Sequence, residues 1–456
     1  MSLDHESVYE LLIQHIHETP ADWVDLFKVL RGISTRFRHL VDTRIRSLSL
    51  KNKKVQDVEK ALLTFPHLQH VYLHVKLGKN PHDEVARLLQ AIHNRPSLQI
   101  VWLWGKDVLT TGAYWHIENS NLARDCLPLG LRKLQLGGEV METFSHDQAR
   151  LLFEQQWVNL SSLELTVSED LLFDDTLYAI LARASRAGSF PVLEILIIGK
   201  GEVSNENVSC LAQGDWSRLT ELWLDNAYEC EALSLATMKE LRVATPVLTC
   251  LNMSGAAFQV DACKMVGHLK RLVLRDCGLD VERLTIIAFQ CDLCDLEFLD
   301  LSYNTFLPER DTPGMYPLLD TCMPKLKELH LNGCGVNSEN LPYVLLVQES
   351  FLDEVRAPEL EVLSLRDNPV LFSPVDGDID DETVGDLLRW EERWGKKPMS
   401  LIMDYTSGIQ LEVLRELDRS GSVLKVEYDF EHEDEDEEEE DSEDDDEEDA
   451  DLPPCK

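Results

Sequence analysis

The 456-residue chain has a formal net charge of −40, and 44% of its residues are hydrophobic. This hydrophobic share is large enough for the chain to fold around a sizeable buried core. The charge argues against nucleic acid and anionic membrane surfaces as partners, because their phosphates would be repelled over most of the protein. Basic proteins are the more natural electrostatic partners.

The N-terminal stretch MSLDHESVYE has neither the basic residues nor the apolar run of a secretory signal. No apolar run approaches the ~18 residues of a membrane span. Eleven cysteines in a chain without a secretory signal favour free thiols in a reducing compartment. We therefore expect a cytoplasmic or nuclear protein that makes no membrane contact.

Residues 1–44 have apolar side chains at helical spacing. Leu11, Leu12 and Ile16 fall on one face of a helix, and a second apolar set follows within residues 26–40. This pattern predicts a compact helical hairpin or three-helix unit ahead of the rest of the chain.

Two stretches of this segment resemble the F-box family. YELLIQHI (9–16) is similar to the family's first helix and ISTRFRHLV (33–41) to its last, although Glu6 and Ser7 stand where a Leu-Pro usually leads. The resemblance implies binding to the adaptor Skp1 of a cullin-RING (SCF) ubiquitin ligase. The apolar contacts would come from Leu11, Leu12, Ile16, Leu26, Leu30 and Phe37.

Two alternatives stay open for the segment. One is a helical cap that shields the open edge of the first repeat strand. The other is a cap derived from an F-box that no longer binds the adaptor.

From residue 45 onward, the pattern Leu-x-x-apolar-x-apolar recurs in twelve units spaced 21 to 34 residues apart. Each pattern predicts a strand with alternating buried positions, and the segments between the strands show helical spacing. The clearest helical segments are VARLLQAI (85–92), QARLLFEQ (148–155), LYAILARA (177–184), VERLTIIA (281–288) and VGDLLRWEERW (384–394). Two further strands are predicted within residues 399–405 and 423–430.

The ninth position of four consecutive units is occupied by Cys277, Asn304, Cys334 and Asn368. Together with the leucine spacing, this resembles the leucine-rich repeat of ribonuclease-inhibitor-like proteins over residues 45–430. The resemblance implies a right-handed α/β solenoid of about twelve units and a C-terminal cap. Its parallel sheet would line the concave face, with helices outside. An ordinary doubly wound α/β fold is the alternative.

In this register, the residues between the inward leucines face the concave side. Large apolar side chains at such positions are typical of protein-binding surfaces. The alternatives are a loop that covers them or a strand that is slipped by one residue. The predicted partner surface comprises Tyr72, Trp102, Trp104, Ile197, Trp223, Phe298 and Asp300.

The sequence contains no phosphate-binding loop, nucleophile elbow or His-Glu-x-x-His motif. Cys291 and Cys294 form a single Cys-x-x-Cys without the second pair that a structural zinc requires. We therefore predict no enzyme activity, no cofactor and no metal.

Residues 431–456 form an acidic tail. Between residues 431 and 451, 18 of 21 residues are Asp or Glu, so residues 431–456 carry a net charge of −17 and residues 1–430 carry −23. Such a segment cannot bury apolar surface, and we expect it to be disordered. It would improve solubility, bind basic proteins, or be regulated through Ser442, which has the acidic surroundings of a kinase site.

The sequence as a whole predicts a non-catalytic interaction protein that is monomeric outside its complex. The leading hypothesis is a substrate-recognition subunit of a cullin-RING ligase that holds its target on the concave surface. The alternative is a chaperone-like protein that binds histones or other basic proteins through the tail.

Overall fold

The computed structural model describes residues 47–76, 84–105, 131–138, 146–166, 176–226, 230–304, 323–336, 359–368, 399–404 and 424–429, except for positions 66, 85, 86, 89, 93 and 96. The F-box-like segment, the helix predicted at 384–394 and the acidic tail lie outside these ranges.

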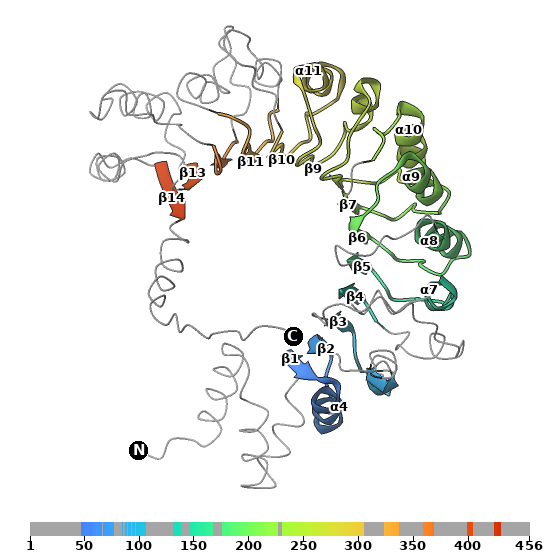
Figure 1. Ribbon diagram of the computed structural model, residues 1–456. Helices are drawn as coiled ribbons and strands as arrows, with labels where there is room; N and C mark the ends of the chain where they lie inside the picture. The colour runs from blue at the N-terminus through green and yellow to red at the C-terminus, as the bar shows by residue number, and fades with distance from the viewer. Residues whose placement is uncertain are drawn as a thin grey trace, which may run out of the picture.

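Fourteen strands form one parallel sheet in which every strand lies beside its neighbours in the chain. Figure 1 shows the strands along the inner side of an arc and the helices along its outer side. The twelve predicted repeat strands are confirmed, as are the two beyond them. The strands are β1 (Ser47–Lys54), β2 (His70–Lys76), β3 (Ile100–Gly105), β4 (Lys133–Gly138), β5 (Ser162–Thr166), β6 (Ile195–Gly201), β7 (Glu221–Asn226), β8 (Cys250–Asn252), β9 (Arg271–Val273), β10 (Phe298–Asp300), β11 (Glu328–His330), β12 (Val362–Ser364), β13 (Met399–Asp404) and β14 (Leu424–Asp429).

The helices lie between successive strands. The predictions for 148–155, 177–184 and 281–288 are confirmed by α7, α8 and α11. Each of α9 and α10 is capped by its own serine, and α11 is capped by an aspartate. Each capping side chain accepts a hydrogen bond from the backbone N–H of the residue three positions later in the chain. The helices are α4 (Val55–Thr64), α7 (His146–Phe153), α8 (Thr176–Arg186), α9 (Asn205–Ala212), α10 (Leu235–Ala244), the 3-10 helix η1 (Val260–Met265) and α11 (Val281–Gln290).

One hydrophobic core runs between the sheet and the helices. The leucines of neighbouring strands stand opposite one another in register, as Leu272, Leu299 and Leu329 do across β9, β10 and β11. All three are 0% exposed. Because side chains alternate along a strand, this register turns the residues between the leucines to the concave side. The fold is thus a leucine-rich repeat solenoid, as predicted.

The ninth position closes the end of each strand in the later repeats. The side-chain oxygen of Asn304 accepts hydrogen bonds from the backbone N–H groups of Cys277 and Leu279, both at 3.0 Å. Its amide nitrogen donates to the carbonyl oxygens of Leu274 and Leu301 at 2.6 and 2.8 Å. Asn304 therefore satisfies backbone groups of two neighbouring repeats that would otherwise be buried without a partner.

Asn368 makes the same kind of contact two repeats later, where its oxygen accepts from the N–H of Val336 at 2.9 Å. The Cys277 and Cys334 thiols each donate to a carbonyl oxygen of the preceding repeat at 3.2 Å. All four ninth-position side chains thus form hydrogen bonds with backbone groups at the ends of the strands.

The sixth unit fills the end of its strand with a helix side chain, whose buried hydroxyl has no hydrogen-bond partner among the described residues. The ninth position of the sixth unit is Gly201, and a Cβ there would lie 2.7 Å from the Tyr178 hydroxyl. Tyr178, from α8, is 0% exposed. It fills the space that the ninth-position side chain occupies in the later repeats. Burial raises the pKa of this phenol, so it stays protonated.

Within the described ranges, no helix has the length and apolar character needed to cross a membrane.

Replacing Asn304 with Ala should lower the free energy of unfolding by about 3 kcal/mol or more, because two buried N–H groups lose their acceptor. Urea denaturation measures the change. The matched control is Asn94→Ala at an exposed position, which should stay within about 0.5 kcal/mol of wild type. Equal effects of the two substitutions would refute the role of Asn304 in satisfying backbone groups at the strand ends.

Candidate functional site: the concave surface

The concave surface is built on a middle row of residues, one from each of the strands β1 to β12. Strand pairing places each of these residues directly opposite the next, so successive members are about 4.8 Å apart. The row runs Ser49, Tyr72, Trp102, Gln135, Glu164, Ile197, Trp223, Asn252, Val273, Asp300, His330 and Ser364.

The first half of the row contains the predicted apolar surface. Tyr72, Ile197 and Trp223 are each partly exposed, and Ile195 is partly exposed beside Ile197 on β6. Ile197 and Trp223 are direct neighbours across β6 and β7. The structure therefore places an aliphatic and an aromatic side chain next to each other on a face that solvent reaches.

Trp102 and Trp104 occupy concave register positions in β3. Their side chains lie outside the described part of the structure.

Three polar side chains lie between the apolar positions and neutralise one another's charge. The Gln135 amide donates to Glu164, and the Lys133 ammonium lies 3.6 Å from the Glu164 carboxylate. Burial raises the pKa of Glu164, while Lys133 and Gln135 oppose that increase. These three side chains satisfy one another and leave little free charge for a partner.

The second half of the row is more enclosed than predicted. Asn252, Val273 and Asp300 are each 7% exposed, and Ser364 is 2% exposed. The expectation that Asp300 is exposed is therefore wrong. Its carboxylate accepts a hydrogen bond from the N–H of Ser302, two residues further along the chain, at 2.9 Å. Asp300 serves the end of its own strand rather than an external partner.

Phe298 is partly exposed, as predicted, and belongs to a contact chain across three strands. The Arg271 guanidinium lies over its ring at 4.0 Å, and the His330 ring lies 5.0 Å away on the other side. His330 in turn is 3.6 Å from the carboxylate of Glu328. Such cation-π contacts hold the planar arginine head in place.

A second aromatic side chain, just beyond the end of β10, contacts residues of other repeats. Tyr303 is 40% exposed, and its hydroxyl donates to Asp367 two repeats further on. The Arg275 guanidinium lies 5.1 Å from the centre of its ring. A Cβ on Gly333 would lie 2.6 Å from the same ring, so the tyrosine crosses directly over this glycine.

Arg271, Arg275 and Tyr303 were not predicted as site residues. A signal existed for Tyr303, because it precedes the ladder residue Asn304. The equivalent positions Asp276, Gly333 and Asp367 all have positive φ. The eighth position of each of these later repeats thus has the left-handed backbone conformation that turns the chain.

No metal centre forms among the described residues. No three of their His, Cys, Asp and Glu side chains gather closely enough to hold a metal ion. The thiol of Cys291 donates to the carbonyl of Cys263 at 3.1 Å, and burial raises the pKa of Cys291 to about 11. A thiol with that pKa is protonated at neutral pH and is neither a ready nucleophile nor a ready metal ligand.

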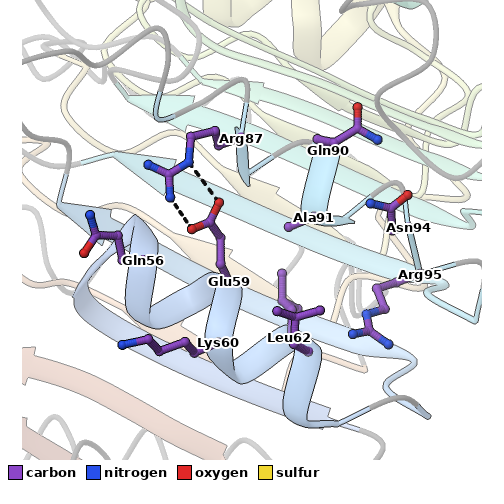
Figure 2. A pocket seen from close by; sticks show the side chains of 10 residues that line it. Gln56, Glu59, Lys60, Leu62, Arg87, Gln90, Ala91, Asn94 and Arg95 are labelled. Carbon is purple, nitrogen blue, oxygen red and sulfur yellow. Dashed lines mark hydrogen bonds and ion pairs between the residues drawn. The ribbon is translucent and has the colours of Figure 1, made fainter.

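The outer side carries an open cleft of about 540 Å³ between α4 and the helical turns near residues 87–92. Figure 2 shows Arg87 reaching across it to Glu59, with Leu62 and Ala91 along the floor. The Arg87 fork donates to both carboxylate oxygens of Glu59, at 3.1 Å for Nε. The cleft is thus a mainly apolar gap between two repeats, bridged by an ion pair.

No family model matches the chain, and no curated protein is similar to it. Among solved structures, yeast Rad7 in complex with Elc1 is 13% identical, with 81% of this chain and 94% of that chain covered and a TM-score of 0.41. LegL7, a leucine-rich repeat-containing protein from Legionella pneumophila, is 14% identical, with 84% and 89% covered and a TM-score of 0.33.

TLR13 in complex with ssRNA13 is 16% identical, with 72% of this chain and 47% of that chain covered and a TM-score of 0.36. At these identities and TM-scores, none of the three bears on function.

Replacing Gly333 with Ala should destabilise the protein more than replacing Gly335 with Ala. Both glycines have positive φ, at 60° and 75°, but only Gly333 lies against the Tyr303 ring. We expect an additional loss of about 1–3 kcal/mol from the clash. Chemical denaturation of both variants measures the difference.

The same pair in a Tyr303→Ala background provides the control. There the additional loss at Gly333 should disappear, leaving only the cost of positive φ. An additional loss that persists without the ring would rule out the crossing.

Proposed function

We propose that the protein is a non-catalytic scaffold that serves as the substrate-recognition subunit of a cullin-RING ubiquitin ligase. The repeat sheet would hold the target on its concave surface, and residues 1–44 would bind the adaptor Skp1. The two surfaces lie on different parts of the chain, so each can be disabled separately.

The observation that carries the proposal is the apolar part of the concave surface. Ile195, Ile197 and Trp223 are partly exposed on adjoining strands, where a monomeric protein has no internal use for them. Aromatic and aliphatic side chains in such a cluster release water when a partner covers them, and a few of them supply most of an interface's binding energy. A rigid sheet presents them without an ordering cost.

The support for the adaptor comes from the sequence. The segments at 9–16 and 33–41 resemble the first and last helices of an F-box, directly before a repeat array that would hold the target. By this resemblance, Leu11 and Leu12 would supply part of the apolar contact with Skp1. The neutralised group around Glu164 favours a protein target over a highly charged ligand.

Changing Leu11 and Leu12 to Asp should remove Skp1 and cullin from the purified protein by at least about tenfold, because buried carboxylates oppose an apolar contact. Quantitative mass spectrometry of affinity-purified wild type and variant measures the loss. Wild-type protein that carries neither Skp1 nor cullin would overturn the adaptor role. Histones or other basic proteins in their place, lost on raising the salt, would support the chaperone alternative.

Changing Ile197 and Trp223 to Ala should leave Skp1 recovery unchanged and reduce recovery of the target about tenfold or more, as expected for loss of a central apolar contact. The matched control is Val243→Ala on α10, which is 81% exposed and lies on the outer side. No co-purifying protein that depends on Ile197 and Trp223 would refute the concave site.

A further inference from the structure

The cleft between α4 and residues 87–95 opens on the outer side of the solenoid and has a volume of about 540 Å³. This volume lies within the range of about 300–1,000 Å³ that is typical of ligand-binding clefts. Leu62 and Ala91 form its floor, and Leu63, which also lines it, is 73% exposed. Among the large apolar side chains in the described part of the chain, only Val243 is more exposed. An exposed leucine beside an apolar cleft is typical of a surface that a partner covers.

An ion pair joins the two walls of the cleft. The Arg87 guanidinium donates to both oxygens of the Glu59 carboxylate, and Figure 2 shows this pair spanning from one wall to the other. Glu59 is the only carboxylate among the described residues that line the cleft. Because Arg87 neutralises it, an acidic ligand would meet no unpaired negative charge on these walls.

Two further cations of the cleft can receive an acidic ligand. Lys60 is exposed and Arg95 is half-buried, and both line the cleft. Within the ranges that the structure describes, neither of them forms an ion pair with a carboxylate. Each can bind a carboxylate of a ligand, and the guanidinium can do so through two parallel hydrogen bonds. The cleft thus combines an apolar floor with cations at its rim.

The surroundings of the cleft differ in charge from the rest of the protein. Residues 47–105 contain eight Lys or Arg and four Asp or Glu, a net charge of +4, whereas residues 1–430 together carry −23. At physiological ionic strength, charges more than about 8 Å away are largely screened, so the local sign governs close contacts. Complementary charge steers a partner to its site and disfavours other sites. An acidic partner is therefore attracted to this end of the solenoid and repelled by most of the remainder.

A protein helix fits these features better than a nucleic acid does. A nucleic acid brings a long row of phosphates, which the strongly negative remainder of the protein opposes. An amphipathic helix lays one apolar edge into a groove and keeps its polar face at the rim. The walls of this cleft are α4 and helical turns of the next repeat. A further helix can pack along such a gap at the usual axis distance of about 8–10 Å.

We propose that this cleft binds an acidic amphipathic helix of a partner protein. A large apolar side chain of that helix enters the cleft beside Leu63 and Ala91, and its carboxylates pair with Lys60 and Arg95. The cleft lies on the outer side, whereas the target surface proposed above is concave, so both can be occupied at once. This inference goes beyond the proposed function and does not depend on it.

The test is a selection from a phage-displayed library of random peptides of about 16 residues, or between four and five helical turns, on the full chain. Peptides that also bind an Ala91→Trp variant, in which the indole fills the cleft, are removed. Fluorescence anisotropy then measures how tightly the remaining peptides bind wild type and the double variant Lys60→Glu with Arg95→Glu. This charge reversal is an independent readout, because the selection does not use it.

Two matched controls accompany the charge reversal. Lys239→Glu reverses an exposed lysine on α10, another helix of the outer side. The pair Ile197→Ala with Trp223→Ala alters the concave surface instead. Both controls should bind the selected peptides as tightly as wild type does. Circular dichroism and thermal melting check that each variant is folded.

The expected result is a set of peptides that combine Asp or Glu with Leu, Phe or Trp at helical spacing. Their affinity should fall at least about tenfold in the double charge reversal, because attraction is replaced by repulsion. If the substitution at the half-buried Arg95 unfolds the chain, Lys60→Glu alone should still weaken binding about threefold, the size of an exposed charge contact.

Three outcomes would overturn the proposal. The first is a selection that yields no peptide, and the second is a set of recovered peptides that are not acidic. The third is a folded Lys60→Glu variant that binds them as tightly as wild type. Loss of binding in the Ile197 and Trp223 control would place the peptides on the concave surface and would equally refute the cleft.

Discussion

The stacking of inward leucines in register is the constraint on which the rest of the structure depends. Each repeat has a strand with one apolar face and a helix with one apolar face. A single unit cannot bury either of these faces. Pairing Leu272 with Leu299, and Leu299 with Leu329, joins the apolar faces of neighbouring repeats into one core. The register leaves no choice for the intervening residues, which must face the concave side.

Closing the strand ends is the second requirement, and the two halves of the array meet it differently. In the later repeats, an asparagine or a cysteine reaches into the turn and satisfies backbone groups of the neighbouring unit. Around β6, the same space is filled from the helix by Tyr178 above Gly201. The sixth unit therefore keeps its core filled although its ninth position carries no side chain.

The concave surface divides along the same line. In the first half, partly exposed apolar side chains and a neutralised polar group offer a partner contact area with little charge. In the second half, short polar side chains such as Asp300 are used by the turns, and the accessible groups are arginines supported on Phe298 and Tyr303. A single sheet thus presents an apolar region beside one in which arginines lie against aromatic rings.

The leucine spacing alone determined the twelve repeat strands, their buried positions and the side of the sheet on which each of their side chains lies. These follow from the two-residue period of a strand and from the recurrence of one pattern, which are local properties of the chain. The ninth-position residues of the later repeats could be identified from the sequence for the same reason. Exposure on the concave face was decided only by the tertiary structure, and so were its contacts. Asp300 is buried because it caps its own strand end, while Tyr303 crosses Gly333 to reach Asp367, 64 residues away. Such contacts depend on which side chains neighbouring repeats bring alongside, and no single repeat contains that information.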